Sequence, residues 1–553
     1  MKRPIFSIFF VCMLIFSAAH GQLTYNNPIL GGFYPDPSIC RVGDEYYLVN
    51  SSFEYFPGLP IMQSKDLVNW VQIGNAMNRN EQFSLAGGRV SQGLFAPTIR
   101  YHEGIFYIIC TNVTKGGNFI ITATDPKGPW SDPIYLPEVN GIDPSLFFDD
   151  DGRTYITYNS VPPDNQSLYN GHRTIRLIEY DVQRQKTIGE NKIIVNGGSD
   201  ISKHPVWIEG PHLYKIKGLY YLMCAEGGTA EAHSEVIFRS KNLSDSFVAY
   251  KDNPILTQRD LNPSRANPIT CTGHADLVET PGGKWYAVFL GCRPYIGDYF
   301  NTGRETFMVP VTWKDGWPII VPSGSEVARQ YPVPYSSTKK VESKFSGDFL
   351  FADDFSSSNL NFRFVMLRNP TADLYKFHNG KLELPLKPVT VAQFDNPAFI
   401  GFRQSNLVCS AKTRLFFNTT KENESAGLLI FQSESHYYYL CKSVKNNEDV
   451  VELFKSVTDK SGKDELIASV NIGADRNYID LKISADKDKY SFYYSTGANK
   501  WKLLKADVNG KFLSTKEAGG FVGSMFGLYG TSNGIPSVNV AKFDWFEYKG
   551  EDI

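Results

Sequence analysis

Apolar and polar residues alternate over short stretches in most of this chain, and the spacing typical of long helices is scarce. Five stretches share one pattern. Proline, once replaced by alanine, is followed two residues later by Ile or Leu, then by a glycine-containing turn and an aromatic-rich segment. The stretches start at Asp36, Ala96, Asp143, Gly210 and His274. Each is typical of two antiparallel strands joined by a tight turn.

The repeat is roughly 45 to 70 residues long, at or above the usual length of a propeller blade. It predicts an all-β fold in which a five-bladed β-propeller carries one repeat in each blade. The innermost strands of a propeller begin near one axis, so residues at the same repeat position converge there. Asp36, Asp143 and His274 share that position, and Glu209 lies one residue before Gly210.

The composition changes after the last repeat. A Pro- and Ser-rich segment at 331–337 is typical of a linker. From about Phe349 onward, many short alternating runs predict a β-sandwich of roughly 200 residues. The predicted domains are a propeller at 22–335, which would carry the site, and a sandwich at 345–553.

The first 21 residues differ from the rest. Lys2 and Arg3 precede an apolar run at 5–16, and Ala19 and Gly21 follow it. This pattern predicts a secretory signal peptide at 1–21, with a mature chain that starts near Gln22 and acts outside the cytoplasm, in the periplasm more readily than as a secreted protein. The run is short for a membrane span, and no later segment is typical of one.

Charge and cysteine content narrow the functional classes. A net charge of −2 and the lack of a basic patch argue against a nucleic-acid partner. Of eight cysteines, Cys12 falls in the predicted signal peptide. The remaining seven are an odd, scattered set that does not resemble a disulfide framework. Cys110 and Cys224 lie in apolar runs and are interpreted as small buried residues. Nothing in the sequence indicates an oligomeric state.

Three carboxylates at one end of the repeat suit glycosidic bond hydrolysis. An inverting reaction needs one carboxylic acid for the leaving oxygen and one carboxylate for water, about 6.5–9.5 Å apart. A third carboxylate raises the pKa of the acid. Glu209 is longer than an aspartate and one residue out of register, so it would reach further towards a leaving group. Asp-Pro-Ser, at Asp36 and Asp143, is also an ordinary turn opener, but the convergence of three acids favours a site.

At these residues the sequence resembles glycoside hydrolase family 43, the group of β-xylosidases and α-L-arabinofuranosidases. The resemblance covers nearly the whole mature chain, including the C-terminal domain, which it implies is concanavalin-like. The segments that carry it are 27–30, 36–40, 52–58, 65–70, 141–147, 209–214, 225–229, 273–275 and 303–306.

The resemblance implies a role for each acid: Asp36 as general base, Asp143 as pKa modulator and orienting group, and Glu209 as general acid. It also implies a small pocket, closed at one end, that releases single terminal sugars. The residues expected to line this pocket are Phe53, Phe95, Thr229, His274, Arg304 and Phe521.

Three of these residues have alternative interpretations. Arg304 could form an ion pair with Glu305 instead of contacting the sugar or Asp143. His274 could be an ordinary buried histidine, and Phe521, in the segment 520–523, could belong to the core of the sandwich.

Two activities fit the resemblance. The first is an α-L-arabinofuranosidase that trims side chains of arabinoxylan or xyloglucan, and the second is a β-D-xylosidase. Phe95 favours the first, because many β-xylosidases of the family have Trp there. A carbohydrate-binding protein without catalysis should lack a carboxylate, and all three are present. The expected partner is an oligosaccharide or polysaccharide.

No cofactor is required for this chemistry. Asp353, Asp354 and Asp544 lie at the two ends of the predicted sandwich, and their oxygens would suit a structural calcium ion if they meet. The alternative is that they are exposed polar strand ends.

Overall fold

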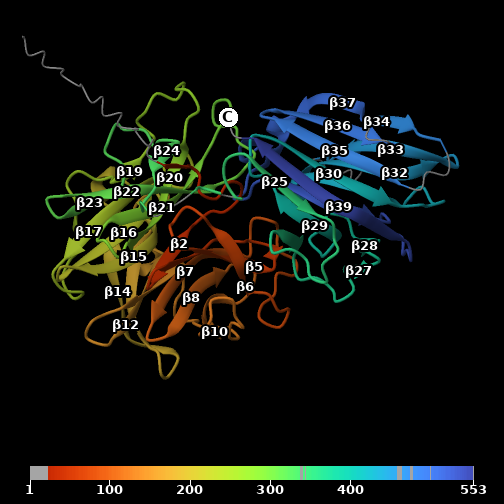
Figure 1. The fold of residues 1–553 in the computed structure, drawn as a ribbon. Coiled ribbons are helices and arrows are strands. Elements are labelled where there is room, and N and C mark those ends of the chain that lie inside the picture. Colours follow the sequence, from red (N-terminus) through yellow and green to blue (C-terminus); the bar gives the residue numbers. More distant parts are fainter. Residues whose placement is uncertain are drawn as a thin grey trace, which may run out of the picture.

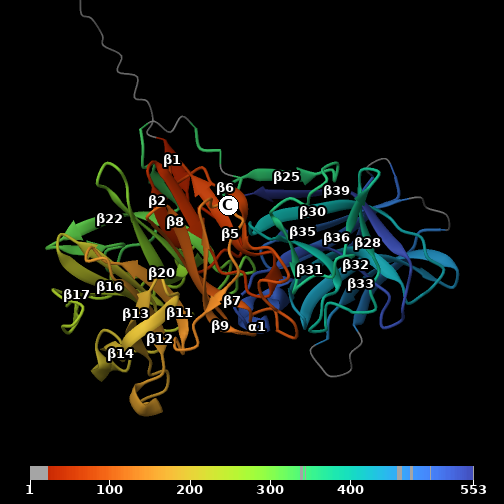
Figure 2. The ribbon, with the colours of Figure 1, turned by 90° about the horizontal axis from the view of Figure 1, so that it is seen from below.

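The computed structural model describes residues 23–336, 340–342, 344–457, 464–473, 478–497 and 500–551, so the predicted signal peptide at 1–21 lies outside it. Two bodies built of strands lie side by side (Figures 1 and 2). The first, coloured red to green, is a ring of five sheets, and the second, coloured green to blue, is a sandwich of two sheets. No helix within these ranges is long and apolar enough to cross a membrane. The predicted all-β propeller followed by a β-sandwich is confirmed.

Each blade is one antiparallel sheet whose strands follow the order of the chain, from the axis outward. The first blade contains β2 (Ser38–Val42), β3 (Glu45–Val49), β5 (Gly58–Ser64) and β6 (Val71–Met77), and the second β7 (Leu94–His102), β8 (Ile105–Asn112), β9 (Gly117–Ala123) and β10 (Ile134–Tyr135). The third contains β11 (Ile142–Phe148), β12 (Thr154–Ser160), β13 (Thr174–Asp181) and β14 (Lys186–Asn196). The fourth contains β15 (Glu209–Ile216), β16 (Leu219–Glu226), β17 (Ser234–Ser240), β18 (Val248–Ala249) and β19 (Leu256–Thr257), and the fifth β20 (Thr270–Glu279), β21 (Trp285–Cys292), β22 (Glu305–Lys314) and β23 (Trp317–Ile319).

The start of the described chain closes the ring against the fifth blade. The amide of Ile29 donates to the carbonyl of Thr306 at 2.9 Å, and Asn27 Nδ2 donates to the carbonyl of Met308 at 2.7 Å. The short strand β1 (Thr24–Asn26) pairs with β24 (Gln330–Pro332). Both ends of the propeller sequence are therefore bound to each other, which leaves no loose edge between the first and last blades.

The repeat position that holds the carboxylates has an unusual backbone in every blade. The residues there all have positive φ: Asp36 (51°), Ala96 (34°), Asp143 (54°), Gly210 (55°) and His274 (53°). In blades two to five the pairing of the first two strands shifts register at this point. Such bulges re-aim a side chain away from the normal alternation. Because the same strained backbone conformation occurs in all five blades, these residues all lie at the same end of the axis.

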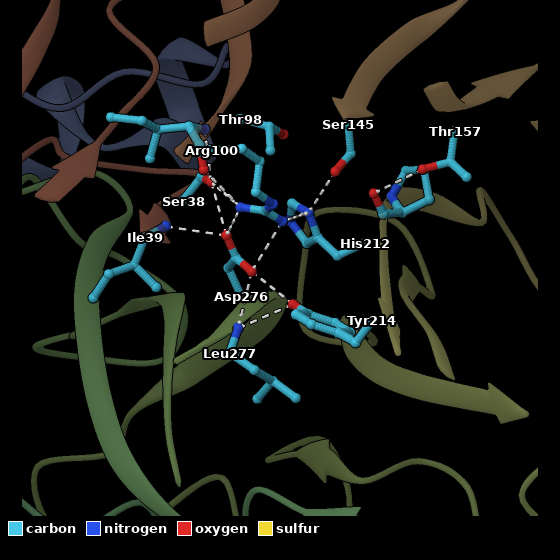
Figure 3. A network of polar contacts seen from close by, with 12 residues as sticks. Ser38, Ile39, Thr98, Arg100, Ser145, Thr157, His212, Tyr214, Asp276 and Leu277 are labelled. Atoms are coloured by element: carbon cyan, nitrogen blue, oxygen red, sulfur yellow. Dashed lines mark hydrogen bonds and ion pairs between the residues drawn. The ribbon is translucent and has the colours of Figure 1, made fainter. Parts of the chain in front are cut away.

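A second ring lies two residues further along each inner strand, and Figure 3 shows it. Its members come from all five blades: Ser38, Thr98, Ser145, His212 and Asp276. Asp276 is fully buried and accepts hydrogen bonds from Ser38 Oγ at 2.7 Å and Tyr214 Oη at 2.6 Å. This ring packs the axis directly beneath the carboxylates.

Arg100 supplies the positive charge of this ring. Its Nη1 lies 2.8 Å from Asp276 Oδ2, and its Nη2 lies 3.1 Å from His212 Nδ1. Burial alone would raise the pKa of Asp276, but Arg100 outweighs it and holds that pKa below the ordinary value. Ser145 Oγ lies 3.0 Å from the same histidine nitrogen. Polar contacts thus join all five blades around one ion pair.

The C-terminal sandwich packs two eight-stranded sheets face to face. One sheet contains β27 (Lys376–His378), β28 (Lys381–Pro385), β39 (Val540–Glu551), β30 (Val408–Phe416), β35 (Ile479–Asp486), β36 (Lys489–Ser495) and β37 (Lys502–Asn509), with β25 (Phe349–Asp353) paired to β39. The other contains β34 (Glu465–Asn471), β33 (Glu448–Lys455), β32 (His436–Lys445), β31 (Ser425–Ser433), β38 (Met525–Thr531), β29 (Ala398–Arg403), β26 (Phe364–Leu367) and β4 (Tyr55–Phe56).

The last strand of that second sheet, β4, comes from the propeller. Tyr55 pairs with Leu367 and Phe56 with Met366. Next to this pair, the amide of Arg368 donates to the carbonyl of Glu54 at 2.7 Å. One hydrophobic cluster continues from the first two blades into the sandwich. The two domains therefore share a sheet and a core, and their relative position is fixed close to the carboxylate end of the axis.

We expect Asp276→Asn to lower the free energy of unfolding by about 3–5 kcal/mol, because it leaves the buried charge of Arg100 without a counter-charge. Denaturant unfolding followed by tryptophan fluorescence measures the change. Asp151→Asn is the matched control, since Asp151 pairs with Arg153 on the surface and should contribute little. Equal stability of the Asp276 variant and the wild type would contradict this account of the axis.

Candidate active site

A cavity of about 430 Å³ opens at the end of the axis where the inner strands begin. Its lining residues are Asp36, Phe53, Phe95, Ala96, Ile142, Asp143, Trp207, Glu209, Gly228, Thr229, His274, Arg304 and Phe521. The structure therefore brings together in one cavity all three carboxylates and all six binding residues named from the sequence.

Asp36 is held in its ionised form. Ser51 Oγ donates to Asp36 Oδ2 at 2.6 Å, and Arg304 Nη1 donates to Oδ1 at 3.2 Å. His274 Nδ1 lies 3.8 Å from the same Oδ1. Burial would raise the pKa of Asp36, but Arg304, His274 and the Ser51 hydrogen bond together lower it below the ordinary value. Ser51 is itself fixed, because the amide of Ala96 in the second blade donates to its hydroxyl at 2.7 Å.

Glu209 and Asp143 are shifted in the opposite direction. Burial raises the pKa of Glu209 well above its ordinary value, and the neighbouring Asp143 and Asp36 add to the rise. Burial also raises the pKa of Asp143, with His274 opposing the shift and Asp36 adding to it. The amide of Gly210 donates to Asp143 Oδ2 at 3.2 Å, which ties Asp143 to the residue after Glu209. An ionised and a protonated carboxyl group in one cavity form an acid–base pair.

Gly210 explains why the carboxylate of the fourth blade is out of register. A Cβ built on Gly210 would lie only 3.0 Å from the ring of His274, and its φ is +55°. A side chain at this repeat position would meet the histidine of the next blade. The carboxylate of the fourth blade is therefore accommodated at the preceding residue, Glu209, at the start of β15.

Three phenylalanines form one wall of the cavity. The ring centroids of Phe53 and Phe95 are 5.1 Å apart, and that of Phe521 is 6.1 Å from Phe53 and 5.9 Å from Phe95. Phe521 belongs to the sandwich, in the loop between α1 (Thr515–Ala518) and β38. Its amide donates to Ser91 Oγ of the propeller at 2.9 Å. Phe521 thus lines the cavity instead of filling the sandwich core.

Arg304 binds neither of the two carboxylates considered for it from the sequence. Glu305 does not pair with it, because Arg293 Nε lies 2.7 Å from Glu305 Oε2 in a fully buried ion pair. Nor does its hydrogen bond go to Asp143, since the acceptor is Asp36. The guanidinium also lies 5.3 Å from the Phe521 ring centre. Consecutive residues on an extended chain point to opposite sides, which separates Arg304 from Glu305.

Three residues near the carboxylates were missed by the sequence analysis: Ser51, Ile142 and Trp207. Ile142 and Trp207 lie one and two residues from Asp143 and Glu209, so their closeness in sequence could have drawn attention to them. Ser51 lies two residues before Phe53, but nothing in the sequence indicates its contact with Asp36. It follows β3 and reaches Asp36 only because the chain turns back across the end of the first blade.

The carboxylates considered for calcium do not form a cage. Asp353 Oδ1 accepts from the amide of Phe355, and Asp354 Oδ1 from that of Ser356, as in ordinary turns. Asp544 pairs with Lys381 at 2.8 Å. Among the described residues, no group of three or more His, Cys, Asp or Glu side chains could hold a metal ion. These residues therefore do not fit a calcium site.

Family comparisons agree with this geometry. The model for "Glycosyl hydrolases family 43" matches residues 25–318, and the model for "Beta xylosidase C-terminal Concanavalin A-like domain" matches residues 352–549. The chain belongs to glycosyl hydrolase family 43. The resemblance seen in the sequence is confirmed, and so is the concanavalin-like nature of the second domain.

Relatives of this family 43 glycoside hydrolase match over nearly their full length. A "Xylosidase/arabinosidase" of Butyrivibrio fibrisolvens is 41% identical, over 94% of this chain and 98% of its own. The "Non-reducing end alpha-L-arabinofuranosidase BoGH43B" of Bacteroides ovatus is 37% identical, over 96% and 95%. A solved GH43_12 structure from a capybara gut metagenome is 41% identical, with a TM-score of 0.85 over 92% of this chain and 95% of that one.

We expect Phe521→Ala to raise KM for an aryl glycoside about tenfold, because the cavity loses one of its three aromatic walls. Steady-state kinetics measure the effect. Phe362→Ala is the matched control, since Phe362 is an exposed phenylalanine of the same domain outside the cavity. An unchanged KM for the Phe521 variant would mean that the sandwich does not contribute to sugar binding.

Proposed function

We propose that this protein is an exo-acting, inverting glycoside hydrolase. It releases single α-L-arabinofuranosyl residues from non-reducing ends of hemicellulose oligosaccharides, such as side chains of arabinoxylan or xyloglucan. The observation that carries the proposal is the meeting of Asp36, Asp143 and Glu209 in one small cavity, in which Ser51 and Arg304 bind Asp36. This environment lowers the pKa of Asp36 and raises that of Glu209. An inverting hydrolysis needs one ionised and one protonated carboxyl group.

In this mechanism Asp36 is the general base. Ser51 and Arg304 hold its two oxygens, so the carboxylate is oriented before substrate arrives. It takes a proton from the water that attacks the anomeric carbon. Glu209 is the general acid, and its proton goes to the glycosidic oxygen as the bond breaks. Attack and departure occur on opposite faces of the sugar, so the anomeric configuration inverts.

Asp143 acts through Glu209. Burial raises the pKa of Glu209 above its ordinary value, and the charge of Asp143 adds to that rise, which favours the protonated acid. The hydrogen bond of Asp143 to the amide of Gly210 positions the start of β15. The ring of Figure 3 lies two residues further along each inner strand, and its members are buried, which supports a cavity that is closed at this end and admits one terminal sugar.

Arabinofuranose is the proposed sugar for two reasons. Phe95 is a smaller wall residue than the Trp found in many β-xylosidases of the family, and it contacts Phe53 edge-on. The Bacteroides ovatus relative is named as an arabinofuranosidase. The second candidate, β-D-xylosidase activity, is favoured by the double name of the Butyrivibrio fibrisolvens relative. Export to the periplasm, guided by residues 1–21, is part of the proposal.

The function is tested by comparing hydrolysis of p-nitrophenyl α-L-arabinofuranoside and p-nitrophenyl β-D-xyloside, followed by arabinose release from arabinoxylan and xyloglucan oligosaccharides. We expect a higher kcat/KM for the arabinofuranoside. Proton NMR should show the inverted anomer as the first product. A higher kcat/KM for the xyloside would establish the second candidate, and a first product of retained configuration would disprove the inverting mechanism.

The two catalytic roles are separable by leaving group. We expect Glu209→Gln to lower kcat on an oligosaccharide by about 10²–10⁴-fold, with a much smaller loss on a dinitrophenyl glycoside, whose leaving group needs no proton. Asp36→Asn should lower kcat on both, because water activation is lost in either case. Glu452→Gln is the control, since Glu452 is a buried carboxylate of the sandwich outside the cavity.

The pH profile of kcat/KM supports the same assignment. Activity should rise with pH as Asp36 ionises, below its ordinary value of about 3.9, and fall as Glu209 loses its proton above its ordinary range. The Glu209→Gln enzyme should lose the alkaline fall on the dinitrophenyl substrate. Persistence of that fall would assign the acid to another group.

A further inference from the structure

Trp207 is the one large aromatic residue of the cavity that the proposed mechanism does not use. It lies two residues before Glu209 and is 38% exposed, although the other aromatic residues of the cavity are buried or half-buried. Its φ of +52° is rare for a bulky residue and turns the chain just before β15. Core packing does not explain a strained, partly exposed tryptophan beside the cavity, so a functional role is considered.

The indole ring is held firmly in place. The guanidinium of Arg173 lies 4.6 Å from its ring centre. Arg173 is fixed in turn, because its Nε and Nη2 donate to Asn159 Oδ1 at 3.0 and 2.7 Å. The amide of Trp207 donates to the carbonyl of Gly171 at 2.8 Å. With Arg173 against the ring, the Trp207 side chain is a preorganised flat surface.

This surface lies on the acid side of the cavity. Trp207 and Glu209 are two residues apart in the chain, and both line the cavity. Phe53, Phe95 and Phe521 form a separate wall near Arg304, the partner of Asp36. Because the general acid protonates the glycosidic oxygen, the rest of the glycan must leave past Glu209. Trp207 is the aromatic residue beside that path.

The loops next to Trp207 also carry exposed apolar side chains. Leu168, Ile201 and Val206 are 71%, 36% and 41% exposed, and they lie in the loops 161–173 and 197–208 with Trp207. A Cβ on Gly171 would lie 2.8 Å from Val206, so the two loops are in contact. The ring of Tyr169 stacks on that of His204, at 4.8 Å between centroids, which also joins the two loops. Exposed apolar residues therefore lie in both of the adjoining loops beside Trp207.

We propose that Trp207, backed by Arg173, is the platform on which the leaving-group sugar of the glycan stacks, and that loops 161–173 and 197–208 contact the next units of the chain. The ligand class is a neutral oligosaccharide of pyranose sugars, whose C–H faces pack on an aromatic ring. The inference rests on the proposed function, because it takes Glu209 as the general acid. It would make Trp207 a determinant of specificity for the glycan, as distinct from the sugar released.

The test compares two substrates with the same terminal arabinofuranose: an arabinofuranosyl xylotriose, and methyl α-L-arabinofuranoside, which has no leaving-group sugar. We expect Trp207→Ala to lower kcat/KM about tenfold more on the oligosaccharide than on the methyl glycoside. Trp207→Phe should recover most of that difference, because a flat ring remains. Trp313→Ala is the matched control, since Trp313 is a propeller tryptophan of 37% exposure outside the cavity.

The outcomes separate the two proposals. Equal losses on both substrates, or no loss on either, would overturn the platform while the hydrolase activity stands. Failure of the wild-type enzyme to release arabinose from either substrate would instead reject the proposed sugar. If the wild type prefers xylosides, xylotriose and methyl β-D-xyloside form the same pair, and the same tenfold difference is expected.

Discussion

The buried ion pair of Arg100 and Asp276 is the contact on which the arrangement of the axis depends. Burying two charges carries a desolvation penalty, and their attraction offsets it only when the remaining hydrogen-bonding groups are satisfied. Asp276 meets this condition, since it accepts from Ser38, Tyr214 and two backbone amides as well as from Arg100. These donors come from the first, second and fourth blades and from the fifth blade itself, so all of them are in place only when the ring is closed. The inner strands consequently begin at fixed positions, and so do the carboxylates two or three residues earlier in the same strands.

The cavity above this ring concentrates negative charge that would be unfavourable if every group were ionised. The structure resolves the conflict unequally. Arg304 and the Ser51 hydroxyl bind Asp36 and lower its pKa, whereas burial and two carboxylate neighbours raise the pKa of Glu209 and favour its neutral form. The opposite pKa shifts are therefore a consequence of the different surroundings of the two carboxyl groups. The positive φ values at Asp36, Asp143 and His274 show that backbone strain is tolerated to achieve this placement.

The repeat pattern was sufficient to predict the blades and the convergence of Asp36, Asp143 and Glu209, because propeller geometry maps equal repeat positions onto one place. It could not predict contacts that have no periodic signal. Ser51, in the loop after β3, donates to Asp36, and Arg304 donates to Asp36 and not to Asp143. The backbone amide of Trp207 donates to Gly171, in the loop between β12 and β13. The pairing of β4 with β26 was equally hidden, since a strand of two residues carries no alternation to detect. Where the chain is regular, sequence was enough, and where side chains select partners across loops, it was not.

That short pairing gives the second domain its part in the site. Phe521 can face Phe53 only if the sandwich is held at a fixed distance from the first blade, and β4 immediately follows Phe53 and Glu54. The same few residues therefore line the cavity and join the domains. Substitutions in the loop that carries Phe521 can reshape the sugar wall without disturbing Asp36, Asp143 or Glu209, because none of the three carboxylates belongs to the sandwich. The catalytic carboxylates therefore belong to the propeller alone, whereas both domains contribute to the wall that contacts the sugar.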